Sequence, residues 1–143
     1  MRVPVPAAAF AFALAMSLCV VAPLPAQITP EQKEICKEAD GRYREMFGKP
    51  PREEGLIVVL MYKYTFCPPQ LSVKKGSLLR FVNVDKRTTH SVWFKDDGRP
   101  ESVRLFSGEH VDVPADLTAG THTFICGPHW ELEKMVGTLA VTP

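Results

Sequence analysis

The feature that most constrains this chain is a series of short β-type segments that runs from Leu56 to the end of the sequence. These segments are rich in branched and aromatic residues, and turn signals such as DDGRP, SGE and AGT separate them. Seven short strands in fewer than 90 residues predict an all-β domain, built as an antiparallel sandwich or barrel. The expected strands are LIVVLMYKYTF (56–66), LSV (71–73), SLLRFVNV (77–84), THSVWF (89–94), HVDV (110–113), THTFIC (121–126) and VGTLAVT (136–142).

The first 26 residues have a different composition, with one basic residue, Arg2, then an apolar run and then small residues. This order is typical of a secretory signal peptide, and we expect cleavage after Ala26. The uninterrupted apolar run from Ala7 to Ala22 has 16 residues, which is short of the roughly 18 that a membrane-spanning helix needs. We therefore expect a periplasmic protein with no membrane insertion after cleavage. An uncleaved membrane anchor and lipidation at Cys19 are the alternatives.

One amphipathic helix is expected between this segment and the strands. Thr29, Pro30 and Gln32 form the pattern of a capping box with proline in the first turn. Apolar residues then recur at helical spacing until Gly48 and Pro50 end the pattern. The expected division of the chain is a signal peptide over 1–26, a helix and linker over 27–55, and the strand-rich domain over 56–143.

Charge and cysteine content narrow the environment and the partners of the chain. Without Arg2, which belongs to the expected signal peptide, the chain has 16 basic and 16 acidic side chains. This balance argues against nucleic acid as a partner, because phosphate binding needs a basic excess. Without Cys19, three cysteines remain, and an odd count in an exported protein implies one thiol with another role. We expect a disulfide between Cys36 and Cys67 and a free Cys126, while three unpaired thiols are the alternative.

Three metal-binding groups lie in one short loop between the last two expected strands. Cys126, His129 and Met135 supply a thiolate, an imidazole and a thioether in the spacing C-x2-H-x5-M. Blue-copper sites combine two imidazoles and one thiolate with a weak axial thioether. The second imidazole must come from elsewhere in the chain, and His90 is the candidate because it follows a turn and begins an expected strand.

Two stretches of the sequence resemble the cupredoxins, the small blue-copper proteins of the plastocyanin and pseudoazurin type. FCPPQLSVKKGSLLRFVNVDKRTTHSV is similar to an early strand, a glycine turn and the first histidine ligand of that family. AGTHTFICGPHWELEKMVGTLAV is similar to its carboxy-terminal ligand loop and last strand. The resemblance covers roughly 56–142 and leaves the helix outside. It implies a Greek-key β-sandwich and one copper ion that cycles between Cu(I) and Cu(II). The implied ligands are His90, Cys126, His129 and Met135.

Two departures from the family pattern bear on the implied site. Many family members have four residues between the second histidine and the methionine, whereas this chain has five, Trp130 to Lys134. The length and angle of the axial bond are therefore open. Ser91 follows the first histidine, where an asparagine is common. We expect its hydroxyl to hydrogen-bond to the cysteine loop over a shorter reach, and such bonds tune the reduction potential.

The resemblance implies a monomeric electron carrier rather than an enzyme. Its partners would be redox proteins such as a c-type cytochrome, a dehydrogenase, an oxidase or a reductase. Copper delivery or storage is one alternative, although an exposed, exchangeable site rich in Met and His would be expected for it. A small copper enzyme is another, because a weakened bond to Met135 would open a coordination position. A structural zinc site is also chemically possible with one cysteine and two histidines.

Several other residues are predicted to shape the surroundings of the site. His122 shares its strand face with Phe124 and Cys126, so we expect it to pack rather than to bind the metal. Trp130 either broadens an apolar docking patch around His129 or folds over the loop. Basic residues in loops that would share the copper end favour an acidic partner by electrostatic steering. These residues are Lys74, Lys75, Lys86, Arg87 and Lys134.

Overall fold

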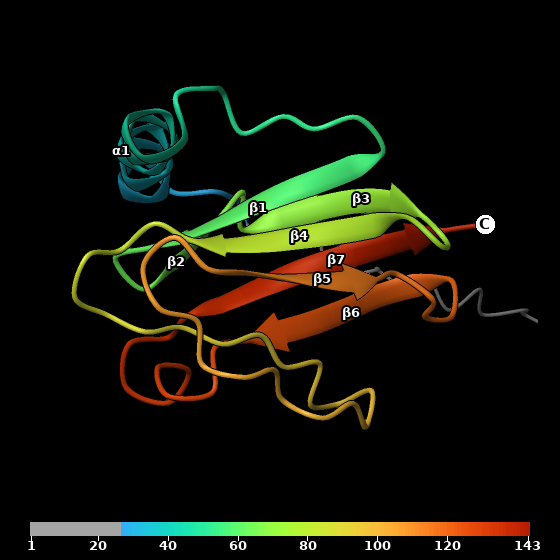
Figure 1. Ribbon diagram of the computed structural model, residues 1–143. Helices are drawn as coiled ribbons and strands as arrows, with labels where there is room; N and C mark the ends of the chain where they lie inside the picture. Colours follow the sequence, from blue (N-terminus) through green and yellow to red (C-terminus); the bar gives the residue numbers. More distant parts are fainter. Residues whose placement is uncertain (1–26) are drawn as a thin grey trace, which may run out of the picture.

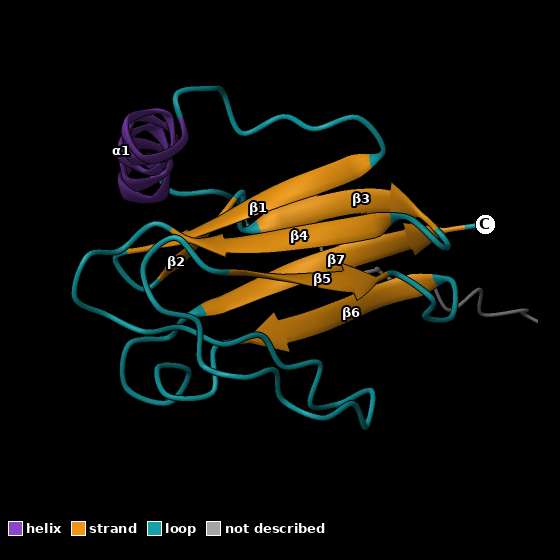
Figure 2. Cartoon of the chain, viewed as in Figure 1, coloured by secondary structure: helices purple, strands orange, loops and turns teal. Residues whose placement is uncertain are grey.

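The computed structural model describes residues 27–143, and the expected signal peptide lies outside the described residues. One helix precedes seven strands (Figures 1 and 2). The elements are α1 Pro30–Phe47, β1 Leu56–Tyr62, β2 Thr65–Cys67, β3 Gln70–Lys74, β4 Leu78–Asn83, β5 His110–Pro114, β6 Gly120–Ile125 and β7 Val136–Thr142. Over this part of the chain, no helix is long and apolar enough to cross a membrane.

Helix α1 forms where the sequence predicts it, because both of its ends are capped. The Thr29 side chain accepts a hydrogen bond from the backbone N–H of Gln32 at 3.1 Å, and the Gln32 side chain accepts one from Thr29 at 3.0 Å. Together these two bonds complete the capping box. At the other end Gly48 takes a left-handed φ of 67°, which suits glycine. The helix buries Ala39 and Tyr43 against β1, β2 and β4.

The strands form two sheets that pack into a sandwich, which confirms the all-β prediction (Figure 2). One sheet has the order β2-β1-β4-β5 and the other β3-β7-β6. We had expected antiparallel neighbours throughout, and this prediction is wrong for two pairs. Strand β1 pairs with β4 in parallel, and β3 pairs with β7 in parallel. The turn at Lys75 and Gly76 explains this difference, since it carries the chain from one sheet to the other instead of closing a hairpin.

The apolar core between the sheets also supports the loop that carries the predicted metal-binding groups. The rings of Phe66 and Phe124 are fully buried, with their centroids 4.8 Å apart in an edge-to-face contact. Gly137 in β7 makes room for this packing, because a Cβ there would lie 2.3 Å from the Phe124 ring. Cys126 and Met135 belong to the same buried cluster. Both ends of the loop are therefore anchored in the core.

Two expected strands differ from the observed ones. Residues 56–66 form the hairpin β1–β2 rather than one strand, with a two-residue turn at Lys63 and Tyr64. Residues 89–94 form only isolated bridges, in which His90 pairs with Leu105 and residue 93 pairs with residue 125. This segment contacts the loop that contains Leu105 on one side and β6 on the other. It therefore has no continuous strand partner.

A disulfide between Cys36 and Cys67 joins α1 to β2, as the sequence predicts. The two cysteines are 31 residues apart in sequence, so the loop-entropy relation gives a stabilisation of about 3–4 kcal/mol. Among residues 27–143, Cys126 is then the free cysteine, and it is buried. The helix lies beside the same end of the sandwich as the loops at 84–90 and 126–135 (Figure 1).

Candidate metal centre

Three predicted side chains meet at this end of the sandwich. His90, Cys126 and His129 each offer one ligand atom, and these atoms lie within 4.8 Å of one another. Sγ of Cys126 is 3.6 Å from Nδ1 of His90 and 3.3 Å from Nδ1 of His129. Bonds of about 2.0–2.3 Å at the roughly 120° angles of a trigonal site would place such atoms about 3.5–3.8 Å apart. The two measured distances are close to this spacing, and the donor set is soft, so the residues present fit a copper ion.

Met135 closes the loop on itself despite the longer spacing. The Cys126 N–H donates to the Met135 carbonyl at 3.1 Å, and the Met135 N–H donates to the His129 carbonyl at 3.2 Å. The additional length is accommodated on the outside, where Leu132 is 88% exposed. Lys134 then takes a positive φ of 55°, and the chain turns inward so that the Met135 side chain is fully buried. The five-residue interval therefore leaves the methionine side chain buried at the end of the ligand loop.

A carboxylate that sequence reasoning missed orients His90. Nε2 of His90 is 2.6 Å from Oδ2 of Asp85, and the histidine side chain is fully buried. A proton on Nε2 donated to this carboxylate leaves Nδ1 free to face Cys126, which is how many metal-binding histidines are held. Asp85 is kept in place by the backbone N–H of Lys63, which donates to the same oxygen at 3.0 Å. Asp85 lies five residues before His90 in the same loop, and this position is the sequence feature from which the contact could have been predicted.

Ser91 makes the bond to the cysteine loop that the sequence predicts. Its hydroxyl accepts a hydrogen bond from the Gly127 N–H at 3.0 Å, and its backbone N–H points at Sγ of Cys126 at 3.4 Å. The hydroxyl in turn donates to Oε1 of Glu101 at 2.6 Å. A Cβ at residue 127 would lie 2.0 Å from that oxygen, so glycine leaves the space that the carboxylate occupies. No sequence signal pointed to Glu101.

Burial determines the protonation states of Cys126 and His129 in the ligand loop. The pKa of the Cys126 thiol is raised, chiefly because burial disfavours the thiolate, although the N–H of Ser91 opposes this shift. The pKa of His129 is lowered, chiefly by burial and then by the neighbouring His90. In the metal-free protein at neutral pH the imidazole is thus neutral and the thiol protonated. Metal binding is therefore coupled to loss of the thiol proton.

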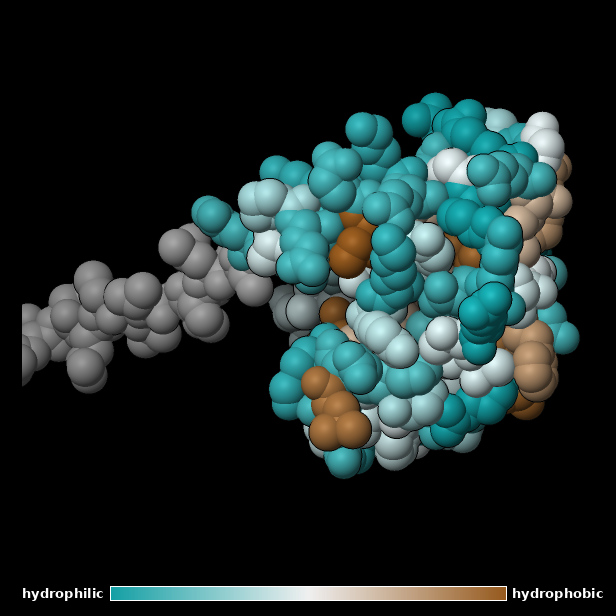
Figure 3. Space-filling model, turned by 90° about the vertical axis from the view of Figure 1, so that its left-hand side faces the viewer, coloured by the Kyte–Doolittle hydropathy of each residue, from teal (hydrophilic) through white to brown (hydrophobic). Residues whose placement is uncertain are grey.

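The outer side of the site is partly open and carries an aromatic ring. The centroids of Tyr64 and His129 are 4.9 Å apart, and their planes meet at 63°. Trp130 lines a depression with Thr123 of β6, under Lys95, whose Nζ is 4.6 Å from the indole centroid. This position favours packing over the loop rather than a patch around the histidine. Seen from this end, the apolar patches are small and separated by hydrophilic residues (Figure 3).

Two other histidines lie outside the cluster. Nδ1 of His122 is 2.7 Å from Oδ1 of Asp97, and its Nε2 is 2.8 Å from the carbonyl oxygen of Thr118. Because acceptors face both ring nitrogens, and the Thr118 carbonyl contributes most, the pKa of His122 is raised. This arrangement agrees with the structural role expected for His122. His110 is exposed at the start of β5.

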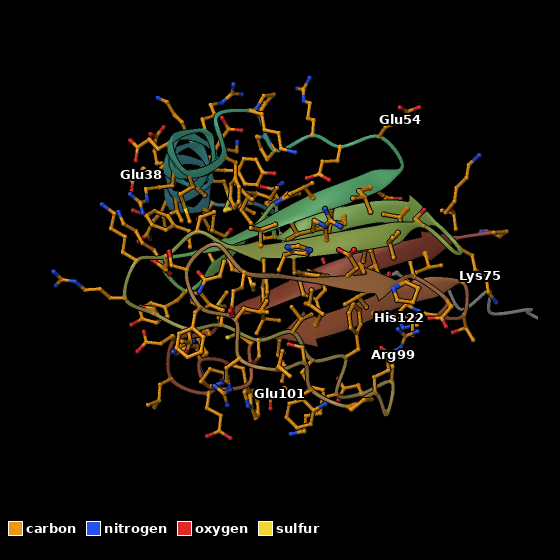
Figure 4. All side chains as sticks on the ribbon, viewed as in Figure 1. Glu38, Glu54, Lys75, Arg99, Glu101 and His122 are labelled. Atoms are coloured by element: carbon orange, nitrogen blue, oxygen red, sulfur yellow. A yellow bond between two sulfur atoms is a disulfide. The ribbon has the colours of Figure 1, made fainter. Side chains whose placement is uncertain are left out.

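The predicted basic residues do not all share the candidate site's end. Lys86 and Arg87 follow Asp85, which contacts His90, and Lys134 directly precedes Met135. The prediction is wrong for Lys74 and Lys75, because the β3–β4 turn reaches the far end of the sheet. The backbone N–H of Lys75 donates to the carbonyl of Thr142 at the end of β7. Figure 4 shows Lys75 at the end away from α1.

Comparison with known proteins places these observations in context. Residues 56–142 match the family model described as copper binding proteins, plastocyanin/azurin family. No curated protein sequence matches the chain.

Solved structures share the fold. A proline-to-glycine mutant of amicyanin, in its reduced Cu(I) form at pH 4, is 25% identical, with a TM-score of 0.54 over 64% of this chain and 86% of that one. A reduced tryptophan-to-tyrosine mutant of amicyanin gives the same values. A copper-containing nitrite reductase from Thermus scotoductus SA-01 is 25% identical, with a TM-score of 0.53 over 67% of this chain. The match spans only 24% of that reductase.

Proposed function

This chain belongs to the plastocyanin/azurin family of copper-binding proteins, and from this premise we propose that it is a blue-copper electron carrier. The proposed ligands of its one copper ion are His90, Cys126 and His129, with Met135 as the axial ligand. The observation that carries the proposal is the convergence of two Nδ1 atoms and one Sγ within 4.8 Å. A fully buried methionine closes the same loop.

The residues of the chain support single-electron transfer by holding a preformed donor set. Bound copper would supply the one-electron couple between Cu(I) and Cu(II). Asp85 orients the His90 ring, and Ser91 directs its N–H toward Sγ of Cys126. These contacts come from loops tied to the sandwich, so the donor atoms need little movement when the charge of the ion changes. Small movement on oxidation and reduction is what a carrier requires.

A copper enzyme is the second candidate, because one structural neighbour is a nitrite reductase. An enzyme centre needs an open coordination position for its substrate. Against this, the side chains of His90, Cys126 and Met135 are fully buried, and His129 carries the Tyr64 ring on its outer side. The same burial argues against copper delivery, which favours an exposed site. The carrier therefore fits the geometry better than either alternative.

The proposed location is the periplasm, and the proposed partners are redox proteins that exchange one electron with a monomer. The predicted signal peptide supports export, and a disulfide such as Cys36–Cys67 persists in an oxidising compartment. A c-type cytochrome or a dehydrogenase would serve as donor, and an oxidase or reductase as acceptor.

A titration of the metal-free protein with Cu(II) tests this function. We expect an intense visible band from thiolate to copper that saturates at one equivalent, and narrow hyperfine splitting in electron paramagnetic resonance. Voltammetry should then show a reversible one-electron couple. Saturation without the band, or turnover of nitrite by the loaded protein, would reject the carrier and favour an open copper site.

A further inference from the structure

Helix α1 lies outside the residues that match the family model, yet it is attached beside the candidate metal centre. The Cys36–Cys67 disulfide joins the helix to β2. Two residues further along the helix, Glu38 accepts a hydrogen bond from Nζ of Lys63, which lies in the β1–β2 turn. The helix is therefore fixed to both the strand and the turn that precede the site in the chain.

The β1–β2 turn has a conformation that needs such support. Lys63 and Tyr64 have φ values of 46° and 58°, in the left-handed region that residues with side chains avoid. Two-residue hairpin turns of this kind usually carry Asn-Gly or Asp-Gly. Besides the bond to Glu38, the turn is held by the backbone N–H of Lys63, which donates to Oδ2 of Asp85 at 3.0 Å. The Thr65 hydroxyl also donates to the Lys63 carbonyl at 3.3 Å.

This turn brings Tyr64 against both imidazoles of the site. Its ring centroid is 4.9 Å from that of His129 and 6.4 Å from that of His90, and both contacts are edge-to-face. The tyrosine is 39% exposed, so it lies between the histidines and solvent. Residues from the first turns of α1 and from the ligand loop line one depression with Tyr64, of about 320 Å³.

We propose that α1 is a brace for the metal centre. It holds the β1–β2 turn so that the Tyr64 ring fixes the orientation of the His129 imidazole and shields it from solvent. Tyr64 is thus a positioning residue, and Glu38 acts on the site only through Lys63. This inference deepens the proposed function and rests on it where copper is involved.

The metal-free protein provides the first test, by NMR of the His129 ring protons. The Tyr64 ring shifts these resonances, so Glu38→Gln, which leaves the ring in the chain but loosens the turn, should move them. Glu34→Gln is the matched control on the same helix, because Glu34 is exposed and, within residues 27–143, its ion pair is with Lys37, at 3.9 Å. A spectrum of Glu38→Gln identical to that of Glu34→Gln would overturn the brace. No copper is needed, so failure here is separate from failure of the proposed function.

The copper-loaded protein provides the second test, by the rate at which the chelator EDTA removes Cu(II). Tyr64→Leu should speed removal by about tenfold, near the upper end for loss of one edge-to-face ring contact. Tyr64→Phe should restore the slow rate, and Glu38→Gln should show a smaller increase. Equal rates in the parent and Tyr64→Leu would overturn the shielding role. Tyr64→Gly is the substitute if Tyr64→Leu fails to fold, because glycine accepts the φ of residue 64 without strain.

Discussion

The candidate centre has two unlike halves. The inner half consists of His90, Cys126 and Met135, whose side chains are fully buried and belong to the end of the sandwich core. The outer half consists of His129 and Tyr64, which are partly exposed and depend on a loop and on a strained turn. The inner half is thus held by the core of the sandwich, and the outer half by the ligand loop and by a turn that α1 contacts from outside the residues matched by the family model.

This difference suggests a division of roles between the two halves. Groups fixed by the core can define a metal's geometry, because close-packed interiors resist displacement. Groups at the surface can instead control exchange with solvent and contact with a partner. Changes to the inner half should therefore alter whether and how copper binds. Changes to Tyr64 and its supports should alter stability or access while leaving the geometry largely intact, whereas His129 is itself a proposed ligand.

The largest effect is expected from Cys126→Ser, which removes the thiolate from the inner half. A serine hydroxyl does not ionise at neutral pH and is a harder donor, so the intense visible band should disappear completely. The measurement is the absorption spectrum at one equivalent of Cu(II). The double variant Cys36→Ala/Cys67→Ala is the matched control, since it also removes sulfur atoms yet should keep the band. Retention of the band in Cys126→Ser would reject the site.

The same double variant should have the second-largest effect, this time on stability. Loss of the disulfide releases α1 from β2 and should lower the free energy of unfolding by about 3–4 kcal/mol. Urea unfolding of the metal-free proteins measures this difference. The unreduced, denatured parent without residues 1–26 should show one reactive thiol, from Cys126. A count of three would mean that the bridge is absent and that the outer half lacks this support.

The sequence was sufficient to predict the four ligand candidates, because their chemistry is concentrated in short stretches. Cys126, His129 and Met135 stand in one loop, and His90 was recognised from its place at a strand end and from the family resemblance. The capped helix and the Cys36–Cys67 disulfide were also predicted, since capping signals and cysteine parity are local properties or simple counts.

The supporting contacts were not predictable, because they depend on which distant segments cross. Glu101 reaches Ser91 only because residues 101–105 run beside 90–92, as the bridge between His90 and Leu105 shows. Tyr64 was assigned to the interior of a strand, since alternation of apolar residues gives no indication of a two-residue turn there. For the same reason, the pattern predicted β3 to β7 but neither the division of residues 56–66 into two strands nor the two parallel pairings.

Gly127→Ala should have a moderate effect that is confined to the inner half. The new Cβ would lie 2.0 Å from Oε1 of Glu101, and this flexible side chain would move and release the Ser91 hydroxyl. Loss of that charged hydrogen bond should destabilise the metal-free protein by about 1–3 kcal/mol. It should also shift the visible band, because Ser91 contacts Sγ of Cys126. Urea unfolding and the copper spectrum measure the two effects.

A glycine elsewhere supplies the control for this substitution. No atom lies within 4 Å of a Cβ built at Gly41, which is in α1. Gly41→Ala should therefore stabilise the protein by up to about 1 kcal/mol through helix propensity, with no change in the spectrum. An unchanged spectrum in Gly127→Ala as well would show that Glu101 does not act on the thiolate.

The smallest effect on stability is expected from substitution of His122, which belongs to neither half. This substitution tests whether a change elsewhere in the sandwich reaches the candidate centre. Its folded-state pKa is raised by the Thr118 carbonyl and by Asp97, so its stabilisation is complete below the unfolded pKa of about 6.5. It is then lost as the pH rises through the folded pKa.

His122→Gln should therefore be less stable than the parent by about 1 kcal/mol at pH 5.5, and the difference should shrink above pH 7. The lowered pKa of His129 has the opposite pH dependence, but it is present in both proteins and cancels in the difference. Urea unfolding of the metal-free proteins across this pH range measures the effect. A difference that grows with pH would mean that His122 is buried as the neutral ring. If the copper spectra are unchanged throughout, the edge strand β6 tolerates the loss of this ion pair without disturbing Cys126, which directly follows it. An inner half that is anchored in the core requires this result.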